Sequence, residues 1–167
     1  MIHLLFLMLG PVPLDSMPIP PPDPKRLFYL QRTPNTNTII CDVNMKGGVP
    51  DPEEPVHVSW IRYTEQGRHA ELTYIQRNFA YGIDSREVSP GKFELHFVSY
   101  KKYSMYLMRG PDGQYHVYAT VHGRTLILKR IYLQISGGSF WVPKVDYVQL
   151  MGKDAQTGAD VSTRMNV

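Results

Sequence analysis

Short runs of β-branched, aromatic and aliphatic residues follow one another along most of the chain, and turn residues bound each run. Runs of this length and spacing are typical of antiparallel strands. Only residues 70–81 show a helical pattern. The sequence therefore predicts a mainly β fold, an antiparallel sandwich or barrel of about nine or ten strands with one helix near residues 70–81. The predicted strands are RLFYLQ, NTIICDV, VHVSWIRYT, YGIDSREV, KFELHFVS, YSMYLMR, QYHVYATV, RTLILKRIYLQI, KVDYVQLMG and ADVSTRM.

The chain has the length and composition of one domain, with 167 residues of which 43% are hydrophobic. Half of its 14 prolines lie between Pro11 and Pro24, where missing donors and fixed φ angles favour an extended segment. We therefore expect a proline-rich linker over residues 17–24 and a single β-rich domain over residues 25–167. The linker is interpreted as a spacer, with a ligand for an adaptor domain as the alternative.

The N-terminal residues include a short apolar stretch, Leu4 to Leu9, which is too short to cross a bilayer. It fits the apolar region of a secretory signal, although only His3 precedes it and no small-residue cleavage site follows. We interpret residues 1–16 as a weak or shortened signal segment and expect a periplasmic or secreted protein. A packed or disordered cytoplasmic N-terminus is the alternative.

Several kinds of chemistry find no support in the sequence. The single cysteine, Cys41, lies in the apolar run TIICDV, which favours a buried side chain over a reactive thiol. The formal charge is only +3 and basic residues do not cluster, so we do not expect nucleic-acid binding. The two histidines of the central strands, His96 and His116, fall two strands apart in the predicted register, too far for one zinc ion. We therefore expect neither a metal site nor a cofactor.

Turn residues fix the pairing of the central strands. The turn RGPDGQ pairs Gly110 with Gln114, and therefore Leu107 with Val117 and Tyr106 with Tyr118. The turn VHGR pairs Val121 with Arg124 in the same way. Between the two preceding strands the hydrophobic pattern requires a loop of odd length, such as residues 100–102, because a slip of one residue would exchange the faces. The predicted core face is Phe93, Leu95, Phe97, Met105, Leu107, Val117, Ala119, Leu126 and Leu128.

The opposite face of these strands mixes rings, imidazoles and charges. It consists of Glu94, His96, Tyr106, Met108, His116, Tyr118, Ile127 and Lys129. Tyrosine rings on such a face supply apolar area with a polar end, so His96, Tyr106, His116 and Tyr118 are candidate residues for binding a small molecule or a glycan. The alternative is a second, half-hydrated layer of core beneath the helix or a loop.

Two further surfaces carry exposed-type aromatic residues. Trp141 follows the glycine-rich stretch SGGSF and is a candidate binding anchor or a packed lid. On the predicted helix an apolar stripe of Leu72, Ile75 and Phe79 is expected to face the sheet. A second stripe consists of Tyr74, Arg77 and Tyr81, which are candidates for a partner surface or amphipathic residues that cover neighbouring loops.

Four segments resemble a known family: LQRTPNTNTIICDVN, PVHVSWIRY, ELTYIQRNFAYGI and VDYVQLMGKDAQTGADV. They resemble an uncharacterised bacterial domain-of-unknown-function family, four-eight-three-three. The resemblance covers nearly everything after Arg26 and implies a compact β-rich domain that is exported. It implies no activity. The matching positions are Arg32, Asn35, Asn37, Trp60, Gln76, Ala80, Tyr81 and Gly82.

We therefore predict an exported, non-enzymatic β-rich domain that binds a partner protein or a small ligand such as a glycan. One alternative is a hydrolase-type enzyme that uses His96 with Glu94, or His116 with Asp84. The other is a structural or assembly subunit that uses its sheet edges.

Overall fold

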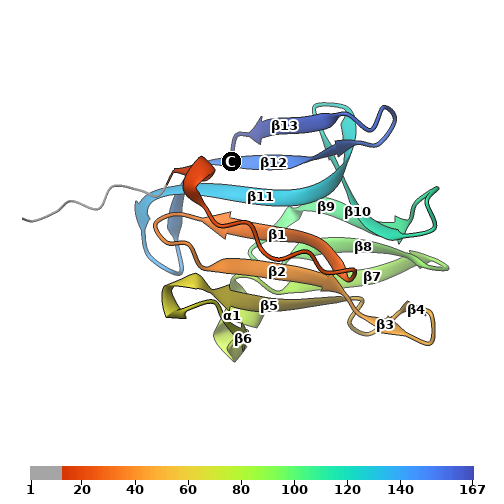
Figure 1. Ribbon diagram of the computed structural model, residues 1–167, viewed down its shortest axis with the longest axis horizontal. Helices are drawn as coiled ribbons and strands as arrows, with labels where there is room; N and C mark the ends of the chain where they lie inside the picture. Colours follow the sequence, from red (N-terminus) through yellow and green to blue (C-terminus); the bar gives the residue numbers. More distant parts are fainter. Residues whose placement is uncertain (1–12) are drawn as a thin grey trace, which may run out of the picture.

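The runs predicted as strands form one large curled sheet in the computed structural model, which describes residues 13–167 (Figure 1). The mainly β architecture with a single α-helix is confirmed. The predicted signal segment, residues 1–16, falls largely outside the described residues. The elements are η1 (Leu14–Ser16), β1 (Arg26–Arg32), β2 (Thr38–Val43), β3 (Met45–Lys46), β4 (Val49–Pro50), β5 (Val56–Arg62), η2 (Tyr63–Glu65), β6 (Arg68–Glu71), α1 (Tyr74–Phe79), β7 (Ile83–Ser89), β8 (Lys92–Phe97), β9 (Tyr100–Arg109), β10 (Tyr115–Val121), β11 (Arg124–Gly138), β12 (Pro143–Asp154) and β13 (Asp160–Met165).

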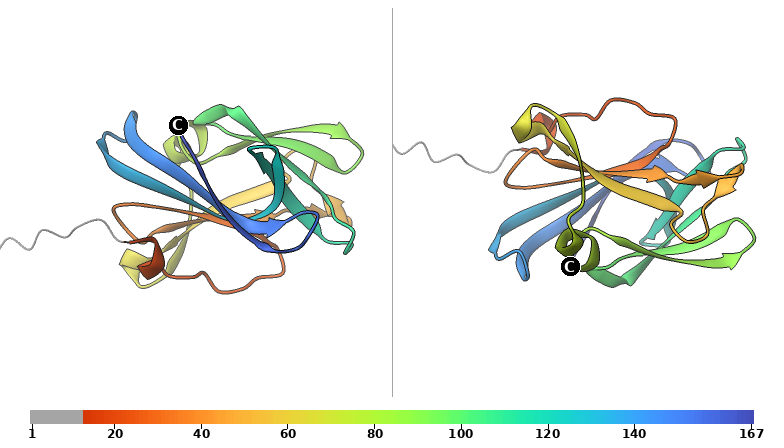
Figure 2. Two further views of the ribbon diagram at one scale, coloured as in Figure 1. Left: turned by 90° about the horizontal axis from the view of Figure 1, so that it is seen from above. Right: turned by 90° about the horizontal axis from the view of Figure 1, so that it is seen from below.

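Strand β11 joins the two layers of the sheet. Its first residues, 124–127, pair with β10, whereas residues 130–133 pair in parallel with β1. β12 accompanies β11 along its length and carries β13 on its other edge. The sheet therefore runs β6-β5-β2-β1-β11-β10-β9-β8-β7 and curls back on itself, so that two layers face each other in a sandwich or half-barrel (Figure 2). Within residues 13–167, the parallel pairing of β1 with β11 departs from the predicted antiparallel arrangement.

The core lies between these two layers. All nine residues of the predicted core face belong to the main hydrophobic cluster or pack against it. From the other layer, β1, β2 and β5 contribute inward-facing residues at a spacing of two, as a strand requires. Cys41 is among them and is completely buried, as predicted. Burial raises the pKa of its thiol far above the ordinary value, so the thiol is unreactive in the folded protein.

The pairings predicted from turn chemistry are confirmed at both hairpins. Leu107 lies opposite Val117, Tyr106 lies opposite Tyr118, and Val121 lies opposite Arg124. Between β8 and β9 the chain turns at residues 98–99, so the predicted loop at residues 100–102 is wrong. An irregularity between Leu95 and Phe97 shifts the register there and keeps the apolar residues of both strands on one face.

The proline-rich segment before β1 lies across the outer face of β1 and β2 (Figure 1). Met17 and Pro20 are buried there. The fully buried Gln31 donates from Nε2 to the carbonyl of Pro18 at 2.6 Å. A further donor, Nη2 of Arg130, bonds the carbonyl of Leu14 at 3.1 Å. Residues 14–21 therefore act as a strap that covers apolar side chains of the sheet. The position of the domain boundary stays a prediction.

Helix α1 is short and begins with a capping box. The Thr73 hydroxyl accepts from the backbone N–H of Gln76, whose side chain accepts from the backbone N–H of Thr73. After the helix the chain passes so close to itself that a Cβ at Gly82 would lie 1.8 Å from the carbonyl oxygen of Arg77, so only glycine fits. No helix among residues 13–167 has the length and apolar character needed to cross a membrane.

The apolar stripe predicted to face the sheet is largely exposed. Leu72 is buried just before the helix, but Ile75 and Phe79 are 47% and 55% exposed. The prediction was wrong because α1 has only six residues, fewer than two turns, so Leu72 lies before the helix and the stripe does not form one continuous helical face.

The strap can be tested with two residues that lie two positions apart. We expect Met17→Ala to lower the free energy of unfolding by about 2 kcal/mol, because it removes a buried side chain. Ile19, which is 78% exposed, is the matched control. Ile19→Ala should change the free energy of unfolding by less than about 0.5 kcal/mol. Urea denaturation measures both variants, and equal effects would contradict the packed strap.

Candidate functional site

Four side chains that are far apart in the sequence meet at one end of the sandwich. Arg32 is the last residue of β1 and follows the inward-facing Phe28 and Leu30 at a spacing of two. Trp60 on β5 is level with Leu30, because both pair with Ile39 of β2, and α1 with the residues after it supplies Gln76 and Tyr81. We call Arg32, Trp60, Gln76 and Tyr81 the arginine cluster.

Both rings of the arginine cluster contact the guanidinium. The guanidinium carbon of Arg32 lies 5.4 Å from the centre of the Trp60 ring and 5.3 Å from that of the Tyr81 ring. Its Nε donates a hydrogen bond to the Tyr81 hydroxyl. The two rings meet edge to face at 5.3 Å. Trp60 in turn donates from Nε1 to Oε1 of Gln76 at 3.2 Å. The cluster thus holds a cation in a fixed orientation through cation–π contacts and hydrogen bonds.

The charge of Arg32 has no carboxylate to balance it. None of residues 13–167 places a carboxylate within 4.0 Å of its guanidinium, and residues 1–12 contain no acidic residue. Six of the ten arginines do have such a partner. A second guanidinium carbon, that of Arg62, lies 5.6 Å from the centre of the Trp60 ring, but Arg62 is paired with Glu65 at 3.4 Å. Among the described arginines that have no carboxylate partner, Arg32 is the one held against two rings, and its charge is available to an anion.

The loop beside the cluster is held by asparagines. Oδ1 of Asn35 accepts from the backbone N–H of Asn37 at 3.0 Å. Oδ1 of Asn37 accepts from both the backbone N–H and the hydroxyl of Thr64, each at 3.0 Å. These bonds tie the end of β5 to the loop that follows Arg32. The eight matching positions of the family resemblance therefore lie in the arginine cluster, in this loop or next to Tyr81.

The predicted ligand residues His96 and Tyr106 share one carboxylate. Nε2 of His96 lies 2.8 Å from Oε1 of Glu94, and the Tyr106 hydroxyl donates to Oε2 at 3.4 Å. The hydrogen bond from His96 is the main cause that holds the pKa of Glu94 below its ordinary value. The predicted pairing of His96 with Glu94 is thus present in the structure.

His116 and Tyr118 form a neighbouring pair on β10. Nε2 of His116 lies 2.7 Å from Oδ2 of Asp112, and its ring meets the Tyr118 ring edge to face at 6.3 Å. The predicted pairing of His116 with Asp84 is absent, because Asp84 lies opposite His96 in the sheet and pairs with Lys101 at 3.1 Å. Within residues 13–167 no three His, Cys, Asp or Glu side chains could hold a metal ion.

The remaining predicted residues occupy three different settings. Tyr81 points into the arginine cluster and packs against the core. Tyr74 is 76% exposed, and Arg77 pairs with Glu54 at 3.2 Å. Trp141 lies at the tip of the β11–β12 hairpin, where its ring meets that of Phe79. The predicted stripe of three residues therefore does not form one surface.

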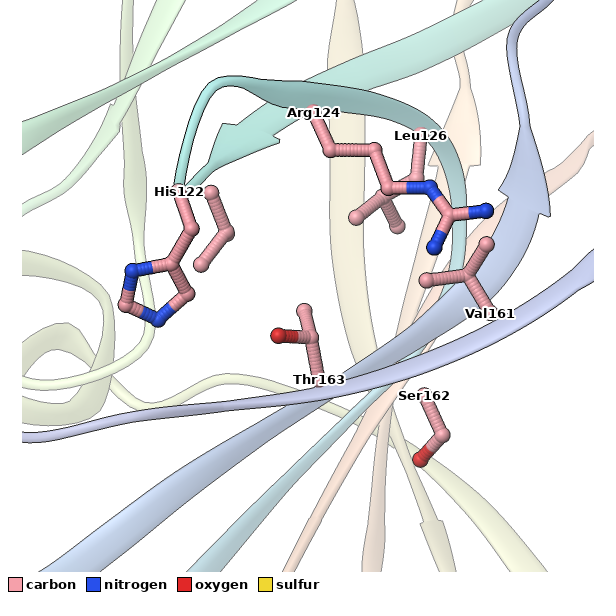
Figure 3. A pocket seen from close by; sticks show the side chains of 7 residues that line it. His122, Arg124, Leu126, Val161, Ser162 and Thr163 are labelled. Carbon is pink, nitrogen blue, oxygen red and sulfur yellow. The ribbon is translucent and has the colours of Figure 1, made fainter.

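A cavity of about 230 Å³ lies between the β10–β11 turn and β13 (Figure 3). The Thr163 hydroxyl points into the space between His122 and Arg124. Nε of Arg124 lies 2.6 Å from Oδ2 of Asp154 and holds the pKa of that carboxyl far below its ordinary value. Because the guanidinium of Arg124 is already paired with Asp154, the cavity is less suited to bind an anionic ligand than the arginine cluster is.

Sequence reasoning missed Arg32 as a binding residue. The signal was present, because Phe28, Leu30 and Arg32 alternate on one face of a strand and place a charge at the edge of the core. Its ring partners come from segments 28 and 49 residues further along the chain, so the cluster appears only once the fold is known.

One comparison with known proteins found a match. A family model described as "Domain of unknown function (DUF4833)" matches residues 28–164. No curated protein and no solved structure matches the chain.

Removing one hydroxyl tests the contact that orients Arg32. We expect Tyr81→Phe to lower the free energy of unfolding by about 1 kcal/mol, because Nε of Arg32 loses its acceptor. Tyr74→Phe, at an exposed position, should leave the free energy of unfolding unchanged within about 0.5 kcal/mol. Chemical denaturation compares the two, and a neutral Tyr81→Phe would show that this hydrogen bond does not hold the guanidinium.

Proposed function

The chain belongs to the DUF4833 family, and we propose that it is a non-enzymatic binding domain whose arginine cluster captures a carboxylate group of a small ligand or partner protein. The observation that carries the proposal is the guanidinium of Arg32, fixed between two rings and left without a carboxylate.

The physics of guanidinium recognition supports a carboxylate as the occupant. A planar guanidinium pairs with a planar carboxylate through two parallel hydrogen bonds, and the stacked rings reduce the freedom that Arg32 would lose on binding. Because Nε is engaged by Tyr81, the two Nη groups are the donors that remain for a ligand. Trp60 is only 3% exposed, so its indole supports the guanidinium of Arg32 and does not contact the ligand.

A thermal-shift titration with succinate tests the proposal. At ten times the dissociation constant, binding stabilises the folded state by about 1.4 kcal/mol and raises Tm by roughly 3–6 °C. Succinamide, which has the same shape but no charge, should have no effect. Arg32→Gln should abolish the rise.

Arg109→Gln is the matched control for this titration. Arg109 also stacks over a ring, at 5.2 Å from the centre of Tyr115, and also has no carboxylate partner among residues 13–167. The variant should keep the full response to succinate. A rise that survives in Arg32→Gln, or equal losses in both variants, would assign the effect to general ionic stabilisation.

A hydrolase is the second candidate, and the 2.8 Å contact between His96 and Glu94 favours it. A carboxylate can orient an imidazole as a general base. If the domain hydrolyses esters, peptides or glycosides, His96→Asn should remove the activity. His57→Asn should keep it, although His57 also contacts a carboxylate, Glu71, at 3.1 Å. Activity retained in His96→Asn, or none across a broad substrate panel, contradicts this candidate.

A further inference from the structure

Exposed aromatic side chains gather where α1 meets the β11–β12 hairpin. Phe79, Phe140 and Trp141 are 55%, 47% and 63% exposed. The ring centres of Phe79 and Trp141 lie 5.7 Å apart, and those of Phe140 and Trp141 lie 5.0 Å apart. Val142 extends the patch and is 75% exposed. We call Phe79, Phe140, Trp141 and Val142 the aromatic tip.

The aromatic tip is not part of the hydrophobic core. Its rings touch one another and none belongs to the main hydrophobic cluster of the described residues. Two segments about sixty residues apart in sequence thus bring apolar side chains together in solvent. A contiguous apolar surface of this kind on a folded domain is typical of a docking site.

Lysines without carboxylate partners flank the aromatic tip. Lys144 is exposed two residues beyond Val142. Lys102 is exposed at the start of β9, and the preceding turn is bound to the end of α1 because the Ser99 hydroxyl donates to the carbonyl of Ala80 at 2.6 Å. No carboxylate within residues 13–167 pairs with either lysine.

Two of the acidic groups near the tip are paired with a cation. Asp84 pairs with Lys101 at 3.1 Å, and Glu71 pairs with Arg77 at 3.6 Å. A third, Asp146, lies two residues beyond Lys144 and accepts from the Ser136 hydroxyl at 2.8 Å, but pairs with no cation of the described residues. The unpaired groups are therefore two lysines and one carboxylate, and the excess positive charge complements a negative surface.

We propose that the aromatic tip docks the domain onto the surface of a bilayer that contains anionic phospholipid. Trp and Phe side chains enter the interface between headgroups and acyl chains, where an apolar ring and a polar edge are both accommodated. Lys102 and Lys144 remain at the level of the headgroups and attract their negative charge. The proposal uses none of the residues of the arginine cluster and stands independently of its function.

Vesicle flotation tests the proposal directly. Wild-type protein should float with vesicles of phosphatidylcholine and phosphatidylserine at three to one, and bind much less to phosphatidylcholine alone. Trp141→Ala with Phe79→Ala should reduce binding at least tenfold. Lys102→Gln and Lys144→Gln should each weaken it about fivefold on the anionic vesicles. Brominated lipid should quench the fluorescence of Trp141 and spare the buried Trp60.

The β3–β4 hairpin supplies a matched control at the other end of the molecule (Figure 1). Met45 and Val49 are 41% and 50% exposed, and Met45→Ala with Val49→Ala should keep full binding. Arg32→Gln should also keep it, so the two proposals can fail separately. Absent vesicle binding overturns the proposal. Tip-dependent self-association without vesicle binding would assign the surface to protein contacts instead.

Discussion

The bend in β11 is the constraint on which the rest of the fold depends. This strand pairs with β10 at its start and with β1 over residues 130–133, while β12 follows it along nearly its whole length. A register shift between Leu128 and Arg130 marks the change of partner. Gly152 lies opposite, and a Cβ there would stand 1.9 Å from the carbonyl oxygen of Ile127. The two strands can therefore approach closely only because residue 152 is glycine, and the layers close over the core as a result.

The same bend decides what gathers at one end of the sandwich. Once β1 is held against the second half of β11, its last residue lies beside the end of β5 and the segment after α1. Arg32 consequently meets Trp60 and Tyr81. An arginine in such a setting contributes to stability through its contacts with the rings, but its charge remains available, because no carboxylate of the described residues neutralises it. In Arg32, the contacts with the rings and the bond from Nε therefore contribute to stability, while the two Nη groups remain for binding.

Local features of the sequence predicted much of the fold, and distant contacts account for what was missed. Turn residues set the register of β9, β10 and β11 because a hairpin pairs residues close in sequence. The parallel pairing of β1 with β11 joins residues about one hundred positions apart and leaves no local signal. Likewise, the proline composition predicted an extended strap, but the burial of Met17 depends on a sheet face that only the assembled fold presents. The sequence placed His96 and Glu94 on one strand face, whereas the arginine cluster depends on the topology of the whole sheet.

The central claim is that Arg32 receives a carboxylate, and side-chain NMR tests it most directly. The chain contains two tryptophans, so the indole N–H of Trp141 is an internal control for that of Trp60. During a titration with succinate, we expect the Nε–H signal of Arg32 and the indole signal of Trp60 to shift and saturate together while Trp141 stays unchanged. A titration in which Arg32 does not move, or in which both indoles shift equally, would contradict the account.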